Sequence, residues 1–289
     1  MGIIDEIKKG AEKNGTKIQS SEAAKLEKIF NKMFYTDHDI EEETKFIHMV
    51  MTRGLESQER KGLHASAVIV GDKQWCEREQ VLSLLFKRIQ KENTPIGLLR
   101  IFEEGNAIHE KWQRLLIRAK YGKAKTMDKT RMNTKYEVSY TPDIVCRIPE
   151  FFDGVMVGEI KSVNSFQFKK MTEHPSARKQ LQFYMYLCIE EAKRKGKWNG
   201  KDYTKGFVLC DSKNDQDFKL FIYDYDPDFV QPFIDRLETV KYGKETYLNE
   251  GKLPAKCKAC TSVDCKRSEE CAMKNACWNV GFGRIEIWK

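Results

Sequence analysis

The sequence predicts an α/β fold in which the strands are partly covered by helices. Segments with an apolar stripe at helical spacing alternate with short segments rich in β-branched residues, and a turn-rich stretch joins two of these into a hairpin. With 289 residues and 40% hydrophobic content, the chain can form one large domain, or one domain with an appendage.

Helices are expected ahead of the hairpin. Residues 1–60 are highly charged, contain no proline and have a helical tendency. Residues 75–90 place apolar side chains at helical spacing, and residues 96–119 carry a longer apolar stripe. That stripe consists of Leu98, Ile101, Phe102, Ile108, Trp112, Leu115 and Leu116.

The hairpin and the elements after it follow from turn chemistry and periodicity. Strands are expected at 144–148 and 155–161, because Pro149-Glu150-Phe151-Phe152-Asp153-Gly154 between them is rich in turn residues. The later elements are a helix at 177–192, strands at 206–210 and 219–223, a helix at 229–247 and a last strand at 284–288.

Composition places the chain among soluble proteins. Mean hydropathy is −0.62, and no apolar run approaches the length of a membrane span. The first 14 residues lack the apolar stretch of a secretory signal, so we expect a cytoplasmic protein without a membrane partner. The net charge of +8 suits a polyanionic partner, and ordinary solubility explains it equally well.

Two acids are predicted to face each other across the hairpin. If the turn is centred near Phe151, residues whose numbers add up to about 302 stand opposite each other. Asp143 and Glu159 meet this condition. Strand alternation puts Lys161 on the same face as Glu159.

Both faces of the second hairpin strand are apolar, which predicts a buried strand. Buried charges are costly unless they are paired or bind a metal, and carboxylate oxygens suit Mg²⁺ or Mn²⁺. Such an ion activates water and neutralises charge developing on a phosphate, and Lys161 is placed to assist. In a chain with 33% charged residues, a structural ion pair is the alternative reading of Glu159 and Lys161.

Two further groups lie at helical spacing. His109 adjoins the apolar stripe of 96–119, where a lone histidine is either a metal ligand or a satisfied core residue. Gln180 and Tyr184 are four residues apart and therefore share a helix face, at an active site or as a pair at the edge of the core.

Eight of the nine cysteines form two groups. An odd number in a reducing compartment argues against a disulfide framework. Cys146, Cys188 and Cys210 lie in apolar runs and are expected in the core. The crowding of five others within 257–277 predicts metal ligation, and they are Cys257, Cys260, Cys265, Cys271 and Cys277.

Taken in order, these motifs resemble the PD-(D/E)XK nuclease superfamily. They are most similar to its RecB-like branch, which includes the iron–sulfur nucleases of CRISPR adaptation, helicase–nucleases and many phage recombination exonucleases. The resemblance runs from residue 76 to residue 277, and it rests on the ordered set because no single motif is specific. The set is Cys76-x-Arg78, Gly105-x3-His109, Pro142-Asp143, Glu159-x-Lys161, Gln180-x3-Tyr184 and the terminal cysteines.

The resemblance implies a restriction-endonuclease-like core with a central mixed sheet flanked by helices. This core is expected at 71–250, between a helical N-terminal region at 1–70 and a cysteine-rich lobe at 251–289 that closes back on Cys76. The residues implied to bind the catalytic metal are His109, Asp143, Glu159 and the Ile160 carbonyl. Lys161 is implied to be the catalytic lysine, with Gln180 and Tyr184 positioning the DNA strand or supporting the site.

The resemblance also implies a [4Fe–4S] cluster, held by one cysteine before the core and three after it. Cys76 is the upstream candidate, and we expect Cys260, Cys271 and Cys277 to complete the set, which leaves Cys257 and Cys265 spare. A common family ending, Cys-x2-Cys-x5-Cys, is shortened by one residue here. The alternative is a four-cysteine zinc site within 257–277.

The implied function is a metal-dependent DNA nuclease. It would be an exonuclease on single strands or DNA ends, active in recombination, repair or phage DNA metabolism, with a helicase or recombinase as partner. The alternatives are a non-catalytic nucleic-acid-binding module with structural zinc, and a nuclease-fold scaffold for such a partner. Basic residues that could track DNA, or simply form solvated helix faces, are Lys169, Lys170, Arg178, Lys179, Arg194 and Lys195.

Overall fold

The computed structural model describes residues 62–87, 96–123, 126–127 and 129–279. The chain divides into two compact units, residues 1–58 with 95–99 and residues 59–94 with 100–289. Apart from the start of one helix, every element below belongs to the second unit. The helical region predicted at 1–60 and the strand predicted at 284–288 lie outside the described residues.

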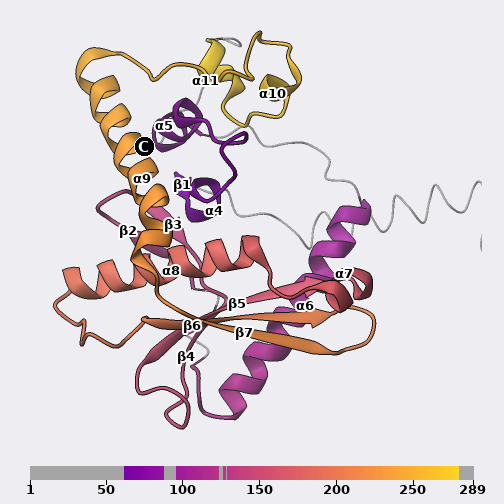
Figure 1. The fold of residues 1–289 in the computed structure, drawn as a ribbon. Helices are drawn as coiled ribbons and strands as arrows, with labels where there is room; N and C mark the ends of the chain where they lie inside the picture. The colour runs from indigo at the N-terminus through magenta and orange to yellow at the C-terminus, as the bar shows by residue number, and fades with distance from the viewer. Residues whose placement is uncertain (1–61, 88–95, 124–125, 128, 280–289) are drawn as a thin grey trace, which may run out of the picture. The chain divides into compact units, whose positions relative to one another are not determined.

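A four-stranded mixed sheet lies at the centre of the second unit (Figure 1). The outer strand β4 pairs antiparallel with β5, β5 pairs parallel with β6, and β6 pairs antiparallel with β7. The parallel step needs a crossover, which the helix α8 (Pro175–Arg194) provides. The strands are β4 (Ile144–Arg147), β5 (Val155–Val163), β6 (Lys205–Ser212) and β7 (Phe218–Asp224).

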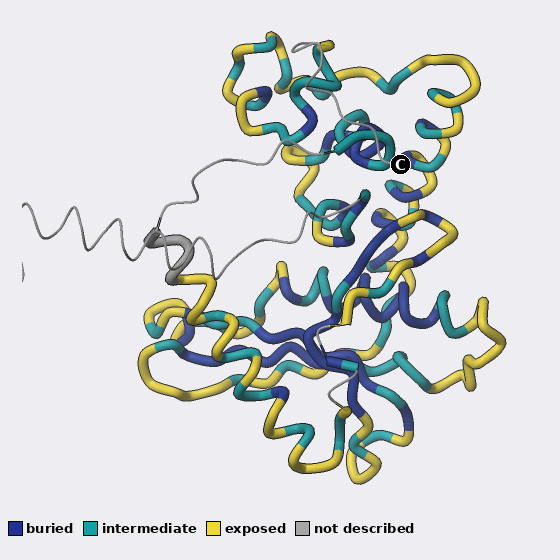
Figure 2. Tube along the Cα trace, turned by 180° about the vertical axis from the view of Figure 1, so that it is seen from behind, coloured by how far each residue is buried: buried dark blue, intermediate teal, exposed yellow. Residues whose placement is uncertain are grey.

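Helices cover both faces of this sheet. Leu181 of α8 belongs to the cluster of buried side chains that includes Val157 and Val208 on one face. Trp112 of α6 (Ile96–Arg118) packs against the cluster on the other face, which includes Ile160. The prediction of an α/β fold with a mixed central sheet flanked by helices is therefore confirmed, and Figure 2 shows the central strands as buried.

The apolar stripe predicted along α6 is only partly buried. Trp112 and Leu116 pack against the sheet, but Ile101, Phe102 and Leu115 are 52%, 50% and 48% exposed. Periodicity identifies the apolar face of a helix, but it does not give the length over which another element covers that face. Among the described helices, none has both the length and the apolar character that a membrane span needs.

Several short helices and strands were not predicted from the sequence. Strands of two or three residues are too short to show a period, and three of them form a second sheet with the order β1-β3-β2. The strands are β1 (Leu63–His64), β2 (Arg131–Asn133) and β3 (Val138–Tyr140). The short helices are α4 (Ala65–Val68), α7 (Ser165–Lys170), α10 (Lys266–Glu269) and α11 (Lys274–Trp278).

Two longer helices pack together beside the three-stranded sheet. α5 (Glu77–Leu85) is shorter than the predicted 75–90, because Cys76 and Phe86 on either side are extended. It packs against α9 (Pro227–Glu250) where Gly243 lets the backbones approach closely. A Cβ atom at Gly243 would lie 2.9 Å from Cγ2 of Val81, so alanine would not fit without a shift.

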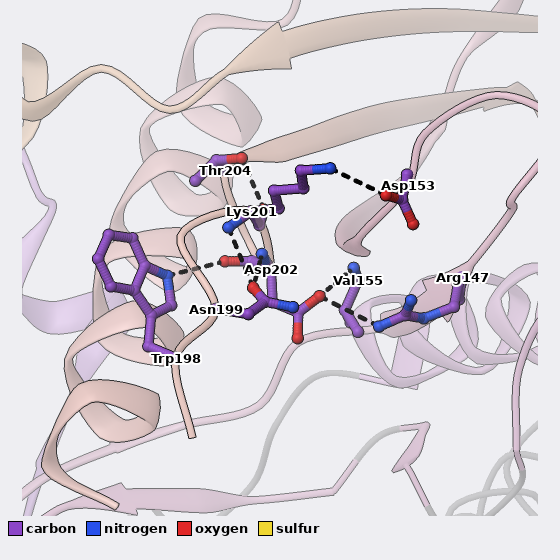
Figure 3. Close-up of polar contacts among 8 residues, drawn as sticks. All are labelled: Arg147, Asp153, Val155, Trp198, Asn199, Lys201, Asp202 and Thr204. Atoms are coloured by element: carbon purple, nitrogen blue, oxygen red, sulfur yellow. Dashed lines mark hydrogen bonds and ion pairs between the residues drawn. The ribbon is translucent and has the colours of Figure 1, made fainter. Parts of the chain in front are cut away.

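The loop between α8 and β6 is tied to the β4–β5 hairpin by Asp202 (Figure 3). Its carboxylate accepts hydrogen bonds from the backbone N–H of Val155 at 2.8 Å and from the guanidinium of Arg147 at 3.2 Å. Beside it, Lys201 donates to Asp153 at 2.9 Å. These contacts fix the far end of the hairpin and therefore help to hold its register.

Candidate active site

The register of the hairpin brings two acids to the same level. Ile144 pairs with Gly158 and Arg147 with Val155, so paired residue numbers add up to 302, as predicted. Asp143, one residue before β4, therefore lies at the level of Glu159. The two residues are 8% and 1% exposed, so both carboxylates are taken out of bulk water.

Asp143 connects the sheet to α6. Its Oδ2 accepts the backbone N–H of Ile160 at 2.8 Å, and its Oδ1 lies 3.5 Å from Nδ1 of His109. Gln113 donates from Nε2 to the Asp143 carbonyl at 2.9 Å. Gln113 was not among the predicted site residues, although its spacing of four from His109 marks the same helix face. The Ile160 contact is through its amide, and the metal-binding role of its carbonyl stays a prediction.

Glu159 belongs to a chain of hydrogen bonds that reaches α8. Nζ of Lys161 donates to Oε1 of Glu159 at 2.6 Å and to Oε1 of Gln180 at 3.2 Å. Nε2 of Gln180 then donates to the hydroxyl of Tyr184 at 3.0 Å. The structure thus brings the predicted strand residues and the predicted helix residues into one network.

The network fixes the charge of its members. Burial acts to lower the pKa of Lys161, but the adjacent Glu159 carboxylate more than offsets this, and the pKa is raised. Lys161 is therefore a cation at neutral pH. Burial and the charge of Glu159 raise the pKa of Tyr184, which keeps its hydroxyl protonated.

The donor set suits a hard divalent cation. Asp143 and Glu159 offer carboxylate oxygens and His109 a ring nitrogen, the ligand types that Mg²⁺ and Mn²⁺ accept. Among the residues described, no three His, Cys, Asp or Glu side chains stand close enough to enclose an ion as they are. In this arrangement Oε1 of Glu159 already accepts a hydrogen bond from the Lys161 ammonium. The residues fit the cation by chemistry, and a bound ion would compete with Lys161 for Glu159.

A buried acid that the sequence analysis did not single out holds α6 in place. Oδ2 of Asp211 accepts hydrogen bonds from Nζ of Lys111 at 2.5 Å and from Nε1 of Trp112 at 2.7 Å. Asp211 is 2% exposed and lies near the end of β6. Because its two donors directly follow the turn that carries His109, these bonds fix the position of the imidazole relative to the sheet.

The first turn of α8 depends on an uncharged histidine. Nδ1 of His174 accepts the backbone N–H of Ala177 at 3.3 Å, which a protonated ring cannot do. Burial, and the charge of Lys161, lower the pKa of His174 below 6.5. Because the folded state depresses the pKa of this basic group, its contribution to stability is complete above about pH 6.5 and is lost as the pH falls through the folded value.

We therefore expect His174→Asn to reduce the loss of thermal stability below about pH 6.5, because asparagine caps the helix without titrating. His174→Ala should lower the free energy of unfolding by about 1 kcal/mol at neutral pH. Denaturant unfolding from acid to neutral pH measures both effects. Parallel pH profiles for the parent and His174→Asn would contradict this account.

The cysteine-rich segment lies against the start of α5. Burial, with a smaller contribution from the neighbouring Cys257, raises the pKa of the Cys76 thiol to about 11. Burial also raises the pKa of Cys260, with smaller contributions from Cys257, Cys265 and Cys277. Cys76 therefore lies near Cys257, which was expected to be spare. Cys146, Cys188 and Cys210 are buried as predicted.

Arg78 joins the two ends of the cysteine-rich segment to α5. Its guanidinium donates to the carbonyl oxygens of Pro254 at 2.9 Å and Cys277 at 3.2 Å. Nearby, Arg267 forms an ion pair with Glu79 at 2.5 Å. Arg78 belongs to the Cys-x-Arg motif, and these contacts give it a structural role.

Comparisons with known proteins give likenesses of fold only. No protein-family model matches the chain, and no curated protein matches it. The crystal structure of SSO0001 matches with a TM-score of 0.40 and 14% identity, over 80% of this chain and 96% of that one.

Two further matches are crystal structures of LHK-Exo. The complex with dAMP has a TM-score of 0.44 and 12% identity, over 65% of this chain and 90% of that one. The structure described as an alkaline exonuclease from Laribacter hongkongensis has a TM-score of 0.41 and 14% identity, over 66% and 93%. At these values the likenesses assign no activity, and function has to be inferred from the side chains of this chain.

Proposed function

We propose that the chain is a metal-dependent deoxyribonuclease of the PD-(D/E)XK type. One observation carries the proposal, the convergence of two buried acids from paired strands with a lysine on one side and an imidazole on the other. Lys161 reaches Glu159 at 2.6 Å, and His109 reaches Asp143 at 3.5 Å. A buried structural ion pair needs neither the second acid nor the imidazole.

The side chains have distinct parts in the proposed hydrolysis. Asp143, Glu159 and His109 would hold Mg²⁺ or Mn²⁺, which when bound acidifies a water and offsets the negative charge of the phosphate. Lys161 orients the attacking water or donates to the phosphate oxygens as their charge grows. Gln180 keeps the Lys161 ammonium in place, and Tyr184 in turn supports Gln180.

Finer aspects of the proposal rest on the family resemblance. We propose an exonuclease that acts on single strands or on DNA ends, in recombination, repair or phage DNA metabolism. A helicase or recombinase is the partner that this role suggests. A cytoplasmic location and the three-part division at 1–70, 71–250 and 251–289 belong to the same set of proposals.

A [4Fe–4S] cluster is part of the proposal. The proximity of Cys76 to Cys257 supports a set that closes the lobe on α5, with Cys257 as a candidate beside Cys260, Cys271 and Cys277. A zinc site confined to 257–277 would not need Cys76. Protein purified without oxygen should be brown, with broad visible absorbance. A colourless protein with one zinc per chain would contradict the cluster and favour a structural metal.

The test of the nuclease is direct. End-labelled single- and double-stranded DNA is incubated with the protein and Mg²⁺ or Mn²⁺, in parallel with an Asp143→Asn variant and with excess EDTA. We expect metal-dependent cleavage by the parent alone. DNA that is bound but never cut, with either metal, would favour the binding module or the scaffold over the enzyme.

A further inference from the structure

Two open hollows lined by basic and aromatic side chains adjoin each other in the second unit. One has a volume of about 640 Å³ and the other about 660 Å³. Thr126, Arg131 and Tyr203 line both of them, and the two adjoining hollows together are here called the basic groove. The first also exposes Lys120, Tyr121, Lys123 and Arg147, and the second Lys129, Lys195 and Lys197.

The basic groove carries excess positive charge. Its acids are Glu150, Glu191 and Asp202, against seven lysines and arginines. Two of these acids are already paired, Glu191 with Lys195 at 2.5 Å and Asp202 with Arg147 at 3.2 Å. Four lysines make no ion pair with any residue that the structure describes, namely Lys120, Lys123, Lys129 and Lys197. These ammonium groups are available to an anionic ligand.

The near end of the basic groove lies beside the candidate active site. The hydroxyl of Thr130 bonds that of Thr141 at 3.0 Å, and Thr126 donates to the Val145 carbonyl at 3.4 Å. Thr141 and Val145 are each two residues from Asp143 in the chain. At about 3.3 Å per residue in extended backbone, Thr141 and Val145 each lie within about 7 Å of Asp143 along the chain.

The residues that line both hollows include the guanidinium of Arg131 and the aromatic ring of Tyr203. Nη1 of Arg131 lies 3.8 Å from Sγ of Cys188. Tyr203 is held at a φ of 68°, uncommon for a residue with a side chain, by a 2.7 Å hydrogen bond to the Val155 carbonyl. Grooves for single-stranded nucleic acid combine flat rings and cations in this way.

We propose that the basic groove binds the phosphodiester backbone of the strand that is cut at Asp143 and Glu159. This inference rests on the proposed nuclease and adds the path of a single strand, from the acids toward the C-terminal end of α8. Gln180 and Lys195 mark the two ends of that path on α8, about 22 Å apart at 1.5 Å per residue. At duplex spacing this is the length of about six nucleotides, and of fewer in an extended strand.

The test compares a variant that loses three unpaired lysine charges of the basic groove with a control variant that loses three lysine charges elsewhere. The groove variant carries Lys123→Gln, Lys129→Gln and Lys197→Gln, and the control carries Lys73→Gln, Lys252→Gln and Lys266→Gln, all at exposed positions. Binding of a labelled single-stranded 20-mer is measured by fluorescence anisotropy over a range of salt concentrations. We expect the salt slope of the groove variant to fall by about 2, at about 0.7 for each phosphate contact, and that of the control to be unchanged.

Cleavage separates this inference from the nuclease proposal. For the groove variant we expect kcat/KM to fall about tenfold on the 20-mer and to stay unchanged on a trinucleotide that cannot reach the groove. An unchanged salt slope would refute strand binding in the basic groove, and cleavage by the parent would still support the nuclease. A parent that cuts nothing would refute the nuclease, and the slope would still test the groove. Equal competition by polyglutamate would also overturn the assignment to a nucleic-acid strand.

Discussion

Replacing Lys161 by alanine should lower kcat for Mn²⁺-dependent DNA cleavage by about 10²–10³-fold and leave DNA binding unchanged. Lys161 donates a hydrogen bond to Glu159, and it does not line the basic groove. Single-turnover cleavage at saturating protein measures the chemical step apart from binding. Lys73→Ala, at an exposed position before α5, is the matched control.

The same variant should also be less stable without metal. Removal of Lys161 leaves Glu159 buried without its ammonium, which costs about 3–5 kcal/mol when one partner of a buried pair is lost. Mn²⁺ should restore part of this loss, so its addition should raise the unfolding temperature more in Lys161→Ala than in the parent. If the variant cuts as fast as the parent, the proposed site is wrong.

Replacing Asp211 by alanine should lower the free energy of unfolding by about 3 kcal/mol. Two hydrogen bonds to a buried charged group are lost, each worth about 1.5–3 kcal/mol, and Lys111 can recover part of this by turning to solvent. Urea unfolding measures the change. Asp215→Ala, in the exposed turn that follows β6, should have little effect and serves as the control.

A positioning role for Asp211 predicts more than lost stability. If its bonds to α6 orient His109, the Mn²⁺ concentration for half-maximal cleavage should rise about tenfold, the scale seen for partners behind a metal ligand. Asp211→Asn keeps an acceptor for Trp112 and should recover most of the metal affinity. A variant that is destabilised but has unchanged metal dependence would limit Asp211 to a structural role.

The hairpin could be predicted in detail because two local rules agree on it. A turn-rich hexapeptide fixes the centre and strand alternation fixes the faces, so the register that aligns Asp143 with Glu159 follows from residue numbers alone. Gln180 and Tyr184 follow similarly from helix periodicity. Both cases involve residues close in sequence, where backbone geometry determines which side chains meet.

Contacts between distant segments could not be derived in this way. That His109 would reach Asp143, and that Asp211 would hold α6, depends on how a helix packs on the opposite face of the sheet from α8. The position of Cys257 beside Cys76 depends on the path of a segment without regular structure. No period in the sequence encodes these distances. The order of the motifs pointed to His109, and nothing in the sequence pointed to Asp211 or to the position of Cys257.

The contact of Arg78 with Cys277 has a consequence for synthesis on the ribosome. The two residues are 199 positions apart, so α5 emerges long before the carbonyl that it will bind. At about 5–20 residues per second, the delay is about 10–40 s. Val81, buried in the folded protein, packs against Gly243 of α9, which is also made long after α5. We therefore expect α5 to expose apolar surface, and the nascent chain to bind chaperones, until α9 has been made.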